Sequence, residues 1–229
     1  MPRASTRITR KALREPDRFL VLTGKALDFV QKNKALCLAF AAAILAIGIA
    51  SAGWSLYRDR QEQLAAAEFT KALALYRSGK YREAAAGFEA ANSYRASPAS
   101  RYALLYQANS HLELNETDRA VKALEALVER ETRPTLLRQL ALLTLGYAHE
   151  TRAQWKEAAR AYGEAAQIEG PYRENALLAK ARCALEAGDY SGALDSYQSY
   201  LKAYPNSIPS AEVELKVQRL KAMVAKAGK

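Results

Sequence analysis

The stretch "GKYREAAAGFEAA", residues 79–91, spaces small and aromatic residues in a pattern that returns later in the chain. Gly79 is followed by Tyr81, Ala84 and Phe88. A close copy lies in "AGDYSGALDSYQSY", residues 187–200, and weaker copies are "NETDRAVKALEAL" from Asn115 and "AQWKEAARAYGEA" from Ala153. The pattern is therefore repeated architecture rather than a single site.

The repeat has a nearly constant period. Its central alanine recurs at positions 84, 120, 158 and 193, in steps of 36, 38 and 35 residues, whereas the charged residues around it do not recur. Apolar residues also follow helical spacing nearly everywhere after residue 60, and alternating β-branched runs are absent. A fixed period of this length in a helical chain predicts an all-α solenoid.

Composition and charge exclude several function classes. The 229 residues carry a formal net charge of +10, but residues 1–34 hold nine basic and three acidic residues and so contribute +6 of it. The remaining +4 is spread over a mixed surface without the basic stripe that nucleic-acid binding requires, so we expect no nucleic-acid partner. The two cysteines, at positions 37 and 183, are not expected to pair, and no metal-ligand spacing occurs.

An uncharged run of 23 residues, "ALCLAFAAAILAIGIASAGWSLY", occupies residues 35–57. As a helix it would span roughly 34 Å, slightly more than a bilayer core of about 30 Å. Trp54 and Tyr57 suit the membrane interface at its far end, and the basic flank before it is typical of a cytoplasmic side. We therefore expect an uncleaved signal-anchor that carries residues 58–229 across the membrane.

Two other interpretations of this run stay open. The first is a buried core helix, although the run is long for one and its flank is basic. The second is a cleaved signal peptide, since Ala50-Ser51-Ala52 would suit a cleavage site, although the apolar run continues past this site and 34 residues precede the run.

Upstream of the run, the pattern of residues 17–33 predicts a short amphipathic helix suited to the inner membrane surface. The first 12 residues have no core-forming pattern.

The repeats resemble the tetratricopeptide family, whose unit is a helix-turn-helix of about 34 residues. The family's small residue at the eighth position is matched by Ala72, Ala108, Gly146 and Ala181, and its later aromatic by Tyr81, Trp155 and Tyr190, with Thr117 as the exception. The resemblance implies a solenoid over residues 58–207 with helix pairs 62–78 and 81–94, 98–114 and 117–130, 134–152 and 155–168, and 172–187 and 190–203. Residues 208–229 would contain a C-terminal capping helix.

In this family the first helix of each pair forms the inner wall of the solenoid. Carried over by position, the predicted wall is mostly apolar and aromatic, and only Asn109 matches the clamp that some members use on a carboxylate. Such a wall would bind an extended or helical apolar segment; alternatively, these residues pack against one another or the C-terminal helix. The predicted groove residues are Phe69, Leu73, Tyr76, Tyr102, Leu105, Asn109, Leu112, Leu143, Tyr147, Glu150, Leu178 and Arg182.

No pattern in the sequence points to an enzyme. The two histidines, His111 and His149, both fall at the eleventh position of their repeat, where the family uses a packing aromatic. Neither a catalytic Ser-His-acid or Cys-His arrangement nor a glycine-rich phosphate loop is evident. We expect no catalytic residue, no metal and no cofactor.

The order of segments also resembles that of the bacterial YfgM-like proteins, ancillary subunits of the SecYEG translocon. That resemblance implies a single-pass inner-membrane protein with a cytoplasmic N-terminus and a periplasmic solenoid. Its expected partners are translocon subunits, periplasmic chaperones or exported clients. Two alternatives stay open: a scaffold or regulator of envelope assembly or cell division that recognises one partner, and a solenoid that mainly forms homo-oligomers.

Overall fold

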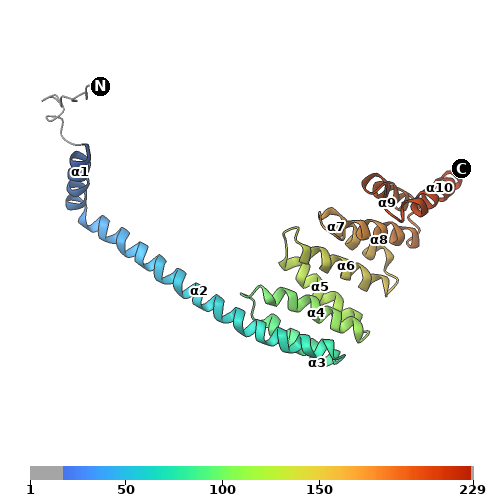
Figure 1. The fold of residues 1–229 in the computed structure, drawn as a ribbon, viewed down its shortest axis with the longest axis horizontal. Coiled ribbons are helices and arrows are strands. Elements are labelled where there is room, and N and C mark those ends of the chain that lie inside the picture. The colour runs from blue at the N-terminus through green and yellow to red at the C-terminus, as the bar shows by residue number, and fades with distance from the viewer. Residues whose placement is uncertain (1–17, 228–229) are drawn as a thin grey trace, which may run out of the picture. The chain divides into compact units, whose positions relative to one another are not determined.

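A computed structural model describes residues 18–227, which form ten α-helices and no strand (Figure 1). The all-helical fold class is thus confirmed over this range. The first 12 residues, for which the sequence shows no core-forming pattern, lie outside the described residues. The helices are α1 (Arg18–Lys32), α2 (Lys34–Arg77), α3 (Tyr81–Ser93), α4 (Ala99–Glu113), α5 (Thr117–Arg130), α6 (Leu136–Glu150), α7 (Trp155–Gln167), α8 (Arg173–Glu186), α9 (Tyr190–Ala203) and α10 (Ser210–Ala227).

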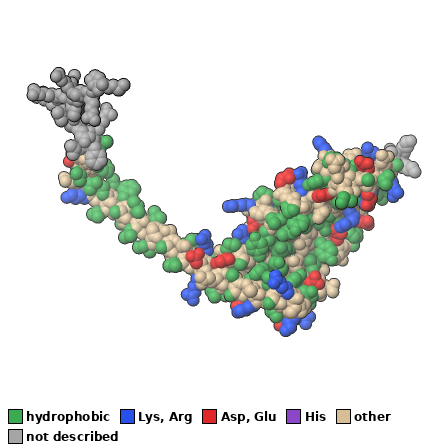
Figure 2. All heavy atoms as spheres, in the orientation of Figure 1, with side chains coloured by type: hydrophobic (Ala, Val, Ile, Leu, Met, Phe, Trp, Pro, Cys, Tyr) green, Lys and Arg blue, Asp and Glu red, His purple; other side chains and the backbone are tan. Residues whose placement is uncertain are grey.

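The contacts within the chain divide it after Tyr57 into two units. In the first unit, α1 exposes apolar side chains such as Leu22 and Leu27, and the apolar part of α2 exposes nearly all of its large side chains. Figure 2 shows this part of α2 covered by hydrophobic and uncharged atoms. The helix is long and apolar enough to be a candidate membrane span, a property that signal sequences share.

Helix α2 is continuous from Lys34 to Arg77, so the apolar run and the first helix of the solenoid are one element. The sequence pattern predicts two separate helices here, over residues 35–57 and 62–78. The structure shows no break because residues 58–61, Arg-Asp-Arg-Gln, contain neither proline nor glycine and are mostly strong helix formers.

The second unit is a series of antiparallel hairpins. The last turns of α2 pair with α3, and the following pairs are α4–α5, α6–α7 and α8–α9, with α10 packed on α9 (Figure 1). Each hairpin also packs on the next through α3–α4, α5–α6 and α7–α8. The solenoid predicted from the repeated alanines is confirmed as the fold, and so are the tetratricopeptide type that the resemblance implied and the predicted C-terminal helix.

All four hairpin turns use the same hydrogen bonds. The residue that follows the left-handed position donates its backbone N–H to the carbonyl five residues earlier: Lys80 to Leu75, Glu116 to His111, Gln154 to His149, and Asp189 to Ala184. This bond closes the end of the first helix and requires a residue with positive φ. The positive-φ residues are Gly79 (77°), Asn115 (58°), Ala153 (53°) and Gly188 (76°).

Small residues allow the helices of a pair to cross closely. Ala72 is fully buried, and a Cβ added at Gly87 would lie 2.8 Å from the Cβ of Ala72. At Gly146 an added Cβ would lie 2.7 Å from the ring of Tyr162, which is only 5% exposed. Large side chains such as Phe88 then fill the space to the next hairpin. This division between small and large positions explains why packing residues, and not charges, repeat along the sequence.

Candidate protein-binding groove

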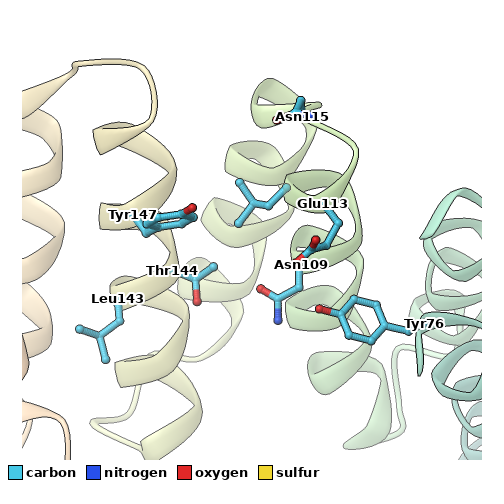
Figure 3. A pocket seen from close by; sticks show the side chains of 8 residues that line it. Tyr76, Asn109, Glu113, Asn115, Leu143, Thr144 and Tyr147 are labelled. Atoms are coloured by element: carbon cyan, nitrogen blue, oxygen red, sulfur yellow. The ribbon is translucent and has the colours of Figure 1, made fainter. Parts of the chain in front are cut away.

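An open groove lies along the first helices of the first three hairpins. One hollow of about 630 Å³ is lined from α2, α4 and α6 (Figure 3). Tyr147 from α6 extends its ring into this space and is 55% exposed. Polar groups stand among the apolar ones, so the surface offers both contact area and hydrogen bonds. The lining residues are Tyr76, Asn109, Leu112, Glu113, Asn115, Leu143, Thr144 and Tyr147.

The groove extends toward α8. A second hollow of about 390 Å³ shares Leu143 with the first and reaches Leu178 and Arg182 on α8. Its remaining lining residues are Tyr162, Asn175 and Ala179. Because one leucine borders both hollows, they form adjacent parts of one surface along α4, α6 and α8.

Seven of the twelve predicted groove residues line these two hollows: Tyr76, Asn109, Leu112, Leu143, Tyr147, Leu178 and Arg182. Phe69 instead lies in an aromatic cluster, with ring centroids 5.5 Å from those of both Phe88 and Tyr106. Leu73 packs on the same cluster, and Leu105 is buried in the core at 8% exposure.

Two predicted residues have other roles in the structure. Tyr102 is half-exposed but lines a different hollow, at the loops between hairpins. Nη2 of Arg182 donates hydrogen bonds to both carboxylate oxygens of Glu150, at 2.7 and 2.9 Å. This ion pair joins α6 to α8 beside the second hollow.

The predicted groove residues did not include Glu113, Asn115 and Thr144 of the first hollow, or Tyr162, Asn175 and Ala179 of the second. Glu113 lies one helical turn after Asn109, and Thr144 lies one turn before Tyr147, so helical spacing could have found both. Tyr162 belongs to a second helix and reaches the groove across Gly146, where any other residue would collide with its ring. The glycine at that position was the available signal.

The comparison with protein families decides the identity of the repeats. The tetratricopeptide repeat model matches residues 69–130, 105–174 and 143–208, which together cover 140 of the 229 residues. The chain belongs to the tetratricopeptide repeat family. A search of curated proteins found no match.

Solved structures share the repeat fold at low identity. A kinesin light chain protein with tetratricopeptide-like repeats from Podosopora anserina has a TM-score of 0.56 at 16% identity, over 72% of this chain and 89% of that one. MamA has a TM-score of 0.57 at 14% identity, over 72% and 86% of the two chains. A tetratricopeptide repeat protein from Parabacteroides merdae has 0.58 at 14%, over 70% and 61%. These likenesses concern the fold alone.

The tyrosines and the cysteine beside this tetratricopeptide groove stay protonated at neutral pH. Burial, with a contribution from the Glu150 carboxylate, raises the pKa of Tyr162, and the same two causes raise the pKa of Cys183 to about 12. Burial raises the pKa of Tyr76 as well, and Glu113 adds to this. The tyrosines are therefore hydrogen-bonding groups at neutral pH, and Cys183 is a thiol rather than a nucleophilic thiolate.

Both histidines serve the turns of their hairpins. His111 and His149 are buried, and Nδ1 of each lies within hydrogen-bonding distance of the side chain five residues later, Glu116 at 2.9 Å and Gln154 at 2.8 Å. Between residues 18 and 227, no group of three or more His, Cys, Asp or Glu side chains is arranged to hold a metal ion. Tetratricopeptide repeats generally serve as scaffolds for protein–protein interaction, and the groove has the form that this role needs.

Proposed function

We propose that this protein is a membrane-anchored interaction platform that binds protein segments in the groove along α4, α6 and α8, on the periplasmic side of a bacterial inner membrane. In this proposal it assists translocation or the transfer of exported chains to chaperones beside the Sec translocon. The observation that carries the binding role is the open groove with Tyr147 exposed among polar and apolar neighbours. An exposed aromatic in a concave wall is the usual anchor point for a partner side chain.

The proposed anchor is the apolar part of α2, residues 35–57. Large apolar side chains along it are exposed, for example Leu38 at 70% and Ile47 at 69%. The rings of Trp54 and Tyr57 lie 5.8 Å apart at its C-terminal end, where amphipathic rings suit a membrane interface. The basic residues before it favour a cytoplasmic N-terminus and therefore a periplasmic solenoid.

The topology can be tested independently of binding. A reporter enzyme that is active only in the periplasm should be active when it is fused after residue 57 and when it is fused near residue 229. The mature chain should also keep its N-terminal residues. A chain that begins after Ala52 would show cleavage and would replace the anchor by a signal peptide. Cytoplasmic activity of the C-terminal fusion would exclude a periplasmic solenoid.

The groove is tested by crosslinking in native membranes. A photoreactive amino acid at Thr144 should capture partner chains, and Tyr147→Ala should reduce that capture severalfold while leaving the fold intact, because Tyr147 is mostly exposed. Tyr190→Ala is the matched control, since Tyr190 is also exposed but lies on α9 and does not line the groove. Equal capture by wild type and Tyr147→Ala would refute the groove.

The identity of the captured chains separates the roles. Translocon subunits together with many unrelated exported proteins would support translocation or hand-over. A single envelope-assembly or division protein in fixed stoichiometry would replace that role by the scaffold. Capture of nothing except the same chain would indicate self-association.

A further inference from the structure

A cluster of arginines lies at the loops between hairpins and is separate from the groove. Arg95 belongs to the α3–α4 loop, Arg101 to the first turn of α4, Arg130 ends α5, and Arg133 lies in the α5–α6 loop. Two adjoining hollows bring the four side chains together, and Arg101 and Arg130 line both. We call this surface the arginine pocket. None of the four lines the hollows of the groove.

Arg130 is held in place by neutral partners. Its Nη1 donates to Oδ1 of Asn92 at 2.6 Å, and its Nη2 donates to Oγ of Ser100 at 2.8 Å. Partial burial, together with the charges of Arg95 and Arg101, lowers the pKa of this guanidinium. Like charges that lie close together in excess over the neighbouring carboxylates form a ready site for an anion.

The acidic groups nearby do not cancel the positive charge. Nη1 of Arg101 donates to Oε2 of the buried Glu131 at 2.8 Å. The negative charge of Glu131 is therefore already paired with Arg101. Glu62 from α2 does not line either hollow, but it accepts a hydrogen bond from Ser97, which lines the smaller one. Among the described residues, Arg95, Arg130 and Arg133 form no ion pair. Four guanidiniums thus face two carboxylates.

Apolar side chains border the same pocket. Tyr102 from α4 is 50% exposed, and Leu136 from α6 is 53% exposed. The larger hollow measures about 600 Å³, which is more than a lone inorganic ion needs and is enough for a few side chains. A ligand that fills it would place an acidic group on the arginines and an apolar group on Tyr102 and Leu136.

We propose that the arginine pocket binds an acidic peptide segment in which a carboxylate stands next to an apolar side chain. The carboxylate lies against Arg130 with Arg95 and Arg133 on either side, and the apolar side chain packs on Tyr102 and Leu136. The charge surplus selects the acid, and the apolar border selects a peptide over a small inorganic anion. This site is additional to the groove of the proposed function and does not depend on it.

The test uses the full chain in a neutral detergent and a short rhodamine-labelled peptide in which Glu and Leu alternate. Fluorescence anisotropy should show binding that weakens as salt is raised. The analogue with Gln in place of Glu should bind at least tenfold more weakly, because it loses charge-assisted hydrogen bonds. Arg130→Gln should have an effect of the same order.

Arg130 also ties α3, α4 and α5 together, so a second variant guards against a loss of fold. The double substitution Arg95→Ala and Arg133→Ala breaks no side-chain hydrogen bond among the residues that the structure describes, and it should weaken binding by about tenfold. The matched control, Arg82→Ala with Arg160→Ala, removes two exposed guanidiniums elsewhere and should bind as wild type does.

Three results would overturn the proposal. Equal binding of the Glu and Gln peptides would show that the pocket does not recognise a carboxylate. Equal weakening by the control pair would show a general charge effect rather than a site. If dioctanoyl phosphatidylglycerol binds with the expected dependence on Arg95 and Arg133 but the acidic peptide does not, the occupant is a lipid headgroup and the peptide assignment is wrong.

Discussion

Replacing Ala153 by glycine should stabilise the solenoid. In the four hairpin turns the left-handed position is filled by Gly79, Asn115, Ala153 and Gly188. Alanine is the poorest of these choices, because its Cβ crowds the following carbonyl at positive φ and it lacks the polar side chain that helps asparagine there. Its φ is 53°, well inside the strained region, and the side chain is exposed, so no packing contact is lost on substitution.

The size of the effect follows from two opposing terms. An L-residue in the left-handed region costs about 1–2 kcal/mol. Glycine avoids this cost but loses about 0.5–1 kcal/mol through its greater freedom in the unfolded chain. The free energy of unfolding should therefore rise by about 0.5–1 kcal/mol. For a unit of this size, 1 kcal/mol corresponds to about 2–4 °C, so Tm should rise by about 1–4 °C.

The assay is thermal and urea unfolding of residues 58–229, with hydrogen exchange of α6 and α7 because solenoids can unfold in parts. Ala86→Gly is the matched control: Ala86 is exposed inside α3, where the same change should destabilise by about 1 kcal/mol. The two variants must differ in sign. If Ala153→Gly lowers stability as Ala86→Gly does, the argument from the turn conformation is wrong.

Two further outcomes follow from the packing around Gly146 and Cys183. Gly146→Ala should destabilise the solenoid by about 1–3 kcal/mol, because the added Cβ would meet the buried ring of Tyr162. Gly163→Ala is the control and should be neutral or stabilising, because the nearest atom to its added Cβ is 3.6 Å away on a lysine. Equal unfolding midpoints of the two variants would contradict this. Cys183 should resist alkylation at pH 8 in the folded chain and react quickly in urea, because it is fully buried and its pKa is raised to about 12. The thiol of the unfolded chain ionises near pH 8.5, so the folded state is favoured as long as Cys183 keeps its proton. This contribution to the free energy of unfolding should therefore be complete below about pH 8.5 and decline as the pH rises to about 12. Fast alkylation of the native protein would refute the burial.

The fold could be predicted from sequence because packing positions repeat even where surface residues change. The alanines at 84, 120, 158 and 193 are each fully buried, which is why substitution at them is constrained and the period is visible. The end of the apolar run was harder to place. Nothing between residues 58 and 61 interrupts a helix, and a charged segment marks a change of surroundings rather than a change of backbone conformation.

The groove was only partly predictable because helical periodicity gives the direction of a side chain and not its depth. Leu105 and Tyr102 lie one turn apart on α4, yet Leu105 is 8% exposed and Tyr102 is 50% exposed. Leu105 packs into a core cluster with residues of α5 and α6, whereas Tyr102 borders the hollow at the loops between hairpins. Phe69 has the correct direction as well, but its ring is held by aromatic neighbours from two other helices. Contacts that cross between repeats leave no trace in the spacing of one repeat.

The form of the groove has a consequence for how the proposed platform would work. A shallow, open wall with Tyr147 as its main exposed aromatic offers few anchor points, so we expect a weak interaction with a short segment, on the order of 5–6 kcal/mol or a dissociation constant of about 100 μM. At a free concentration of about 1 μM, such a site would be about 1% occupied. Tethering the site and the emerging chain at the same membrane raises the effective concentration to about 1 mM, at which occupancy reaches about 90%. Release then needs only diffusion away from the membrane, so an anchored weak groove can retain a chain during export and still pass it on. Untethered residues 58–229 should therefore capture far fewer partners than the full chain at equal expression, although their groove is the same.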